Sequence, residues 1–240
     1  NVVGGSRQAF TWDPSESLVE FGAGNFSFAR CLCDSFEYGE GFVATSLDSL
    51  EQLNLLYPDS ITDTLAHLES RGVRLVHEVD VKRSQDKLGN EKFVRMVFNF
   101  PHSGVEFGLP DTDRGLQSDH RELLRYIFAC AHNSVQDDGF LIVSLLPQQY
   151  DNWRARDYAE RYGWRLEDVI SFPRETFPAY QSVYGDFRDN EAYGNRRARN
   201  FYGSSTPCMF AFTRDKTDSD AASSSDVPED SLSLGTFMNR

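Results

Sequence analysis

The chain of 240 residues has little of what marks membrane or zinc-binding proteins. No stretch approaches the roughly 20 apolar residues that a membrane helix needs, so we expect no membrane span. Its four cysteines include no CxxC pair, and Cys31 and Cys33 face different sides of a predicted helix. We therefore predict buried free thiols and no metal site. The polar start shows no secretion signal, and because it lacks Met we leave an upstream segment open.

Positive charge is also scarce, since 24 Lys and Arg face 37 Asp and Glu for a net charge of −13. Phosphate contacts need Lys and Arg, so this balance argues against a large generic nucleic-acid surface. The one dense basic cluster consists of Arg196, Arg197 and Arg199, which suit RNA or an acidic partner surface equally. From Asp215 the composition shifts to Ser and Asp, which is typical of a tail that only a partner orders.

Apolar runs with a period of two alternate with runs that have helical spacing. We predict strands at 17–21, 41–48, 73–80, 93–100, 139–146, 165–172 and 208–213, and helices at 26–36, 50–56, 61–71 and 152–162, with a long helix capped by Ser118-Asp119. This alternation predicts an α/β fold: a doubly wound, mostly parallel sheet with helices on both faces and an antiparallel edge. We expect one domain at 17–214, an irregular lead-in at 1–16 and an acidic tail at 215–240.

The first predicted strand runs into a glycine turn, Gly22-Ala23-Gly24-Asn25-Phe26. Glycines allow dihedrals that side chains forbid and let the backbone approach a ligand. The helix that follows offers free N–H groups at its start, so the turn is a candidate nucleotide-binding loop. Many such turns have two glycines merely for packing.

Acidic residues end the next two predicted strands. Asp48 is placed to accept hydrogen bonds from a ribose diol, and the alternative is that Asp48 or Ser49 caps the following helix. Asp80 is placed to contact an adenine amino group, and the alternative is a solvated strand end.

The fourth strand ends in Asn99-Phe100-Pro101-His102. An Asn before a Pro at a strand's carboxyl end resembles the loop with which amino-group methyltransferases orient a planar nitrogen. His102 could act as a base or hold a substrate. The alternative is a turn with a capping Asn and a surface His. The other histidines lack metal-ligand spacing, and we expect surface or satisfied helix positions for them: His67, His77, His120 and His132.

Several words together carry a more specific resemblance. FGAGNFSFA, VATSLDS, HEVDV, MVFNFPHSG, GFLIVSLL, QQYDNW and FPAY follow one another between residues 17 and 213. The chain thereby resembles the eukaryotic 25S rRNA (uridine-N3)-methyltransferase-like family, whose glycine loop reads GEGNFSFS and whose fourth strand ends in FNFPH. The resemblance implies a Rossmann-type fold.

The resemblance also implies a function. The cofactor is S-adenosylmethionine, held by the glycine turn, Asp48 and Asp80, and the substrate is a uridine in large-subunit rRNA. Asn99 positions the uracil, His102 accepts its proton or contacts it, and Phe100 and Pro101 belong to the substrate site. Expected partners are rRNA and ribosomal or assembly-factor proteins. The expected location is the nucleolus, with the mitochondrion as the alternative.

Two positions depart from the family pattern. Ala23 stands where the family usually has Glu, and Leu146 stands near where it tends to have Lys. These losses leave a second interpretation open, in which the chain is a catalytically inactive component of a ribosome or assembly particle.

Overall fold

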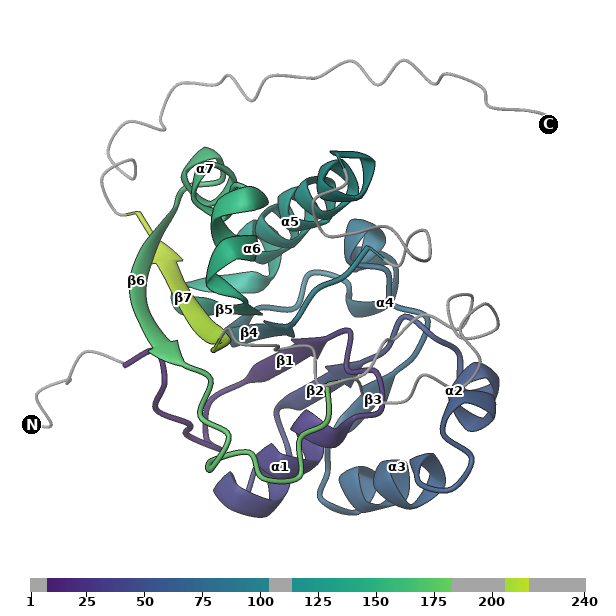
Figure 1. Ribbon diagram of the computed structural model, residues 1–240. Coiled ribbons are helices and arrows are strands. Elements are labelled where there is room, and N and C mark those ends of the chain that lie inside the picture. Colours follow the sequence, from purple (N-terminus) through teal and green to yellow (C-terminus); the bar gives the residue numbers. More distant parts are fainter. Residues whose placement is uncertain (1–7, 104–113, 183–205, 216–240) are drawn as a thin grey trace, which may run out of the picture.

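The computed structural model describes residues 8–103, 114–182 and 206–215. Seven strands form one sheet in the order β3-β2-β1-β4-β5-β7-β6 (Figure 1). The strands are β1 (Leu18–Phe21), β2 (Phe42–Thr45), β3 (Arg74–Val76), β4 (Phe93–Asn99), β5 (Val135–Leu145), β6 (Trp164–Ser171) and β7 (Cys208–Arg214). The helices are α1 (Ser27–Phe36), α2 (Leu50–Leu56), α3 (Ile61–Ser70), the 3₁₀ helix η1 (Val81–Arg83), α4 (Gln85–Leu88), α5 (Arg114–Ser134), α6 (Pro147–Asn152) and α7 (Ala155–Arg161).

The sheet is mostly parallel, as predicted. β1 pairs in parallel with β2 and with β4, and the pairs β2–β3 and β4–β5 are also parallel. β7 is antiparallel to both of its neighbours, β5 and β6. The predicted antiparallel edge is therefore confirmed, with β6 as its outermost strand.

Helices cover both faces of the sheet, which confirms the doubly wound architecture (Figure 1). Leu18 of β1 packs toward α1, α2 and α3, whereas its neighbour Val19 packs in the core on the side of α5 and α7. All four residues of β1 are buried, which is typical of a parallel strand covered on both sides. Among the described helices, none is long and apolar enough to cross a membrane.

The predicted start of the long helix was wrong. α5 already includes Arg114, so Ser118 and Asp119 lie inside it and do not cap it. Leu116 and His120 are both buried on the side of Leu124, and their burial extends the core-facing stripe by one turn. Packing of that turn outweighs the local capping preference.

The single helix predicted at 152–162 was also wrong, because the chain forms α6 and α7 there. Arg154 separates them with a φ of 59°, a left-handed conformation that no helix interior contains. Strands β2 and β3 are shorter than predicted. After Thr45 the chain bends, and the Val79 main-chain N–H donates to the Ser46 carbonyl at 2.9 Å.

The described part of the lead-in packs on the sheet. Arg95 of β4 is 1% exposed, forms an ion pair with Glu16, and donates from Nη2 to the Gln8 carbonyl at 3.0 Å. Trp12 contacts Phe28 of α1 edge to face, with ring centroids 6.0 Å apart. The segment thereby covers part of the core without forming a helix or strand of its own.

Candidate functional site

The parallel strands bring their carboxyl ends to one edge of the sheet. The chain order reverses between β1 and β4, and open α/β sheets bind ligands at the carboxyl ends beside such a reversal. Three non-glycine residues that follow these strands have positive φ: Phe26 at 60°, Glu78 at 59° and Phe100 at 49°. Such conformations cost about 1–3 kcal/mol each and cluster at functional sites. This edge is therefore the candidate site.

The glycine loop joins β1 to α1 at this edge. Gly22 has a φ of +67°, and a Cβ there would lie 3.1 Å from Cε1 of Phe98 on the neighbouring strand. Gly24 also has a positive φ, 51°. Asn25 Oδ1 accepts the Ser27 main-chain N–H at 3.2 Å. Backbone conformation and the nearby Phe98 ring thus both require glycine at the first position.

Phe26 takes the N-cap position of α1 and supplies no side-chain cap. Its ring is fully buried and meets the His77 ring edge to face at 5.9 Å. A contribution of Phe26 to ligand binding would therefore come from its main chain. His77 is itself hydrogen bonded through Nδ1 to Ser46 Oγ at 2.8 Å, which ties the ends of β2 and β3 together.

The two predicted acidic residues differ in their surroundings. Ser49 caps α2, because its Oγ accepts the Gln52 main-chain N–H at 3.3 Å and Gln52 Oε1 accepts that of Ser49 at 2.8 Å. Asp48 is therefore not the cap, although its side chain is only 3% exposed. Asp80 does have a capping role, since its Oδ1 accepts the Lys82 main-chain N–H at 2.9 Å at the start of η1.

Sequence reasoning missed a third acidic residue, Glu20, two positions before Gly22. Glu20 is 2% exposed, and burial raises the pKa of its carboxyl to about 8 although the Ala29 main-chain N–H lowers it. Its Oε2 has no hydrogen-bond partner within the described ranges. The available signal was an acidic residue inside an otherwise apolar strand, LVEF.

Asn99 is held at the end of β4 by the neighbouring strand. The Ser144 hydroxyl of β5 donates to Asn99 Oδ1 at 2.6 Å, and the Phe100 main-chain N–H donates to the Ser144 carbonyl at 3.0 Å. Asn99 Nδ2 is buried and reaches no acceptor among the residues described. A buried donor without an acceptor costs about 1–3 kcal/mol, and such groups often await a ligand.

His102 lies beside a second histidine that sequence reasoning placed wrongly. The His102 ring meets the His120 ring of α5 at a centroid distance of 4.4 Å, nearly perpendicular to it. His120 in turn stacks on Trp153 at 4.2 Å with an interplanar angle of 5°. His120 is 2% exposed, so the expectation of a surface or satisfied helix position does not describe it.

Aromatic side chains surround the residue that follows Asn99. The Phe100 ring packs on Phe172 at 5.4 Å and lies nearly parallel to Tyr180 at 6.3 Å. The segment that contains Tyr180 folds back onto the glycine loop, where the Gln181 main-chain N–H donates to Ser27 Oγ at 2.9 Å. Pro101 is buried. The substrate words and the cofactor word of the sequence therefore meet at one place.

The two departures from the family pattern are both buried. Ala23 is 8% exposed and donates its main-chain N–H to the Thr45 carbonyl at 2.8 Å. Leu146 is 6% exposed and packs at the start of α6. The predicted contacts Arg196, Arg197 and Arg199 lie outside the described residues. Within the described ranges, no three metal-ligating side chains gather into a group.

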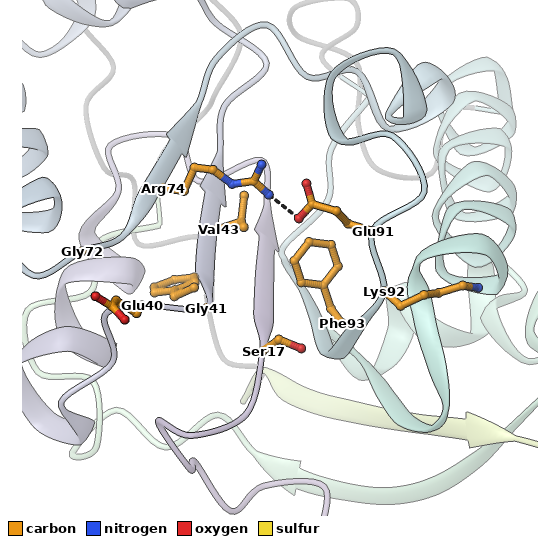
Figure 2. Close-up of a pocket in the computed structure, with 10 residues that line it drawn as sticks. Ser17, Glu40, Gly41, Val43, Gly72, Arg74, Glu91, Lys92 and Phe93 are labelled. Atoms are coloured by element: carbon orange, nitrogen blue, oxygen red, sulfur yellow. Dashed lines mark hydrogen bonds and ion pairs between the residues drawn. The ribbon is translucent and has the colours of Figure 1, made fainter.

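A hollow of about 370 Å³ lies at the other edge of the sheet, near the amino ends of the strands. Figure 2 shows Ser17 and Phe93 along it, and Arg74 pairs with Glu91 at 2.5 Å. Its lining includes none of the predicted site residues.

The carboxyl-end site fits S-adenosylmethionine. That cofactor carries a ribose diol and positive charge, and two buried carboxyl groups, those of Glu20 and Asp48, flank a glycine loop that a larger side chain at Gly22 would fill. The strand order with β7 between β5 and β6, the glycine loop and these acidic residues define the class. The fold is that of a Rossmann-like S-adenosylmethionine-dependent methyltransferase.

Comparison with known proteins gives the family. A family model described as "BMT5-like: rRNA (uridine-N3-)-methyltransferase BTM5-like" matches residues 20–184. The chain belongs to this family.

Individual relatives are distant. An uncharacterized protein of Arabidopsis thaliana is 28% identical over 85% of this chain and 95% of its own. The 25S rRNA (uridine(2634)-N(3))-methyltransferase of Saccharomyces cerevisiae is 24% identical over 70% of this chain and 66% of its own. The crystal structure of NSun6 from Pyrococcus horikoshii with SFG shares the fold with a TM-score of 0.55 and 15% identity, covering 85% of this chain and 49% of that one.

Proposed function

We propose that this protein methylates N3 of a uridine in large-subunit rRNA, with S-adenosylmethionine as the methyl donor. The orientation of the Asn99 amide carries the proposal. Because Oδ1 accepts from Ser144, the amide presents its donor, Nδ2. A donor suits the carbonyl oxygens of uracil, whereas the amino groups of adenine and cytosine would need an acceptor there.

The cofactor is expected in the crevice of the glycine loop. Gly22, Gly24, Asn25 and the main chain of Phe26 would line the methionine and phosphate-like side of the crevice. Asp48 would accept hydrogen bonds from the ribose diol, since Ser49 performs the capping of α2 in its place. Asp80 keeps its proposed contact with the adenine through the carboxyl oxygen that η1 does not use.

The chemistry requires a base, because the uracil N3 must lose its proton before it can form the new N–C bond. S-adenosylmethionine supplies an electrophilic methyl group whose bond to sulfur breaks with the electron pair left on sulfur. His102 would take the N3 proton, and Asn99 Nδ2 would stabilise the negative charge on a uracil oxygen. Phe100 is the proposed stacking surface, and Pro101 fixes the turn that carries it.

Contacts beyond the catalytic edge complete the proposal. Arg196, Arg197 and Arg199 would contact rRNA or a ribosomal or assembly-factor protein. The domain would span 17–214, a division supported by strands that begin at Leu18 and end at Arg214. We expect the nucleolus as the location, with the mitochondrion as the alternative. The family match favours catalysis over an inactive ribosomal component.

The test follows label from the methyl group of S-adenosylmethionine into large-subunit rRNA, which is then digested to nucleosides and separated. We expect label in 3-methyluridine, and Asn99→Ala should lower its rate on the order of 10²-fold. Asn90→Ala, just before the opposite end of β4, is the matched control and should retain the rate. Label in an N6-methyladenosine or N4-methylcytidine peak would contradict the orientation argument. Absence of label from every RNA tested would contradict the proposed function.

A further inference from the structure

Three rings from different parts of the fold form a stack beside the candidate site. His102 follows β4, His120 belongs to α5, and Trp153 follows α6. The His102 and His120 rings meet edge to face at 73°, and the His120 and Trp153 rings are parallel within 5°. Their centroid distances, 4.4 and 4.2 Å, are direct ring contacts.

The middle ring of this stack is fixed. His120 is 2% exposed and Trp153 is 3% exposed, so neither has room to turn into solvent. The third ring, that of His102, is partly exposed at the end of the stack. The arrangement therefore consists of one accessible imidazole that rests against an immobile wall.

Charge fits this arrangement as well. Burial, and then the neighbouring His102, lower the pKa of His120 to about 3, so His120 is uncharged at neutral pH. An uncharged neighbour can stay beside His102 when His102 takes up a proton. A permanently charged side chain at position 120 would oppose that protonation.

A histidine base needs such a wall because its ring rotates about the Cβ–Cγ bond. Only one orientation of the ring directs a nitrogen at the proton to be removed, and misplacement by about 1 Å can cost on the order of 10²-fold in rate. An edge-to-face contact with a fixed ring limits this rotation.

We propose that His120 is a positioning residue, whose ring, backed by Trp153, holds the His102 imidazole in the orientation that accepts the N3 proton of uridine. This inference rests on the proposed function, in which His102 is the base. His120 touches neither substrate nor cofactor in this scheme and acts through His102 alone.

The experiment uses the full chain labelled with ¹⁵N-histidine, and NMR records the ring nitrogen shifts of His102, assigned by their loss in His102→Gln. His120→Leu keeps an apolar side chain in the core but removes the planar ring, and His120→Gln serves if the leucine variant does not fold. His120→Phe restores a ring of similar shape. His132→Gln, on the same helix, is the matched control.

We expect His120→Leu to move the His102 shifts to those of a freely rotating imidazole and to lower kcat on the order of 10-fold to 100-fold. KM for S-adenosylmethionine should stay within about twofold, because the cofactor site is untouched. His120→Phe should restore both the shifts and kcat, and His132→Gln should change neither.

Unchanged His102 shifts in the folded leucine or glutamine variant would overturn the inference, as would equal changes in the His132 control. If the wild-type chain methylates no RNA, the proposed function fails, yet the NMR measurement still decides whether His120 orients His102. The two failures are therefore distinguishable.

Discussion

The buried carboxyl group of Glu20 makes the stability of this protein depend on pH in a predictable direction. In the unfolded chain the group has the ordinary pKa of 4.5, and burial in β1 raises the pKa to about 8. Below pH 4.5 both states hold the proton. Between pH 4.5 and 8 the unfolded chain releases a proton that the folded chain retains, so the free energy of unfolding falls as the pH rises.

The size of the effect follows from the two pKa values. The difference between 4.5 and about 8 sets an upper bound of about 5 kcal/mol, because one pKa unit corresponds to about 1.4 kcal/mol. The steepest loss is about 1.4 kcal/mol per pH unit, and it ends above pH 8, where Glu20 is ionised in both states.

Urea unfolding at intervals between pH 5 and 8.5 measures this loss as a difference from Glu20→Gln. The variant keeps the shape of the side chain but cannot titrate, so other titrating groups cancel in the comparison. We expect the stability of the variant, relative to wild type, to rise by several kcal/mol across this range. Glu69→Gln removes one exposed carboxylate and controls for the change in net charge. A constant difference between wild type and Glu20→Gln, or a variant that loses relative stability toward pH 8, would refute the reasoning.

Two further predictions concern the glycine loop and the acidic residue after β2. Asp48→Ala should weaken S-adenosylmethionine binding on the order of 10-fold to 100-fold in calorimetry, since hydrogen bonds to a charged group contribute about 1.5–3 kcal/mol. Asp59→Ala, an exposed acidic residue, should leave the affinity unchanged, and equal affinities in both variants would remove Asp48 from the site. Gly22→Ala should lower stability by about 1–3 kcal/mol in thermal unfolding, from its positive φ and the nearby Phe98 ring. Gly89→Ala has a similar φ of +62° with no atom within 4 Å and should lose less, so equal losses would show that the Phe98 contact is unimportant.

Local signals sufficed to predict much of the fold. The apolar strands and the helices between them were recognised because each is marked by its own residues, such as LVEF before Gly22 or the stripe of Leu124, Ile127 and Phe128 on α5. Errors arose where packing overrode a local signal. The cap expected at Ser118 lies inside α5, because Leu116 and His120 are buried one turn earlier.

The site was harder to predict, because its side chains meet through contacts distant in the chain. His120 carries a local signal, since it lies four residues before the buried Leu124, but its partner Trp153 is 33 positions away. The burial of Glu20 depends on α1 packing over β1, a fact that the strand alone does not contain. The individual site residues were nevertheless marked, because strand ends are local features.

The register of the sheet explains how a small residue can govern the substrate preference proposed above. Asn99 of β4 is paired directly with Ser144 of β5, so both side chains project to the same side of the sheet. A slip of one residue would turn Asn99 to the opposite face and separate it from the Ser144 hydroxyl. With the observed register, that hydroxyl occupies Oδ1 and leaves Nδ2 for the ligand. Sequence analysis treated Ser144 only as part of an apolar strand, yet through this bond it determines whether Asn99 offers a donor or an acceptor to a base.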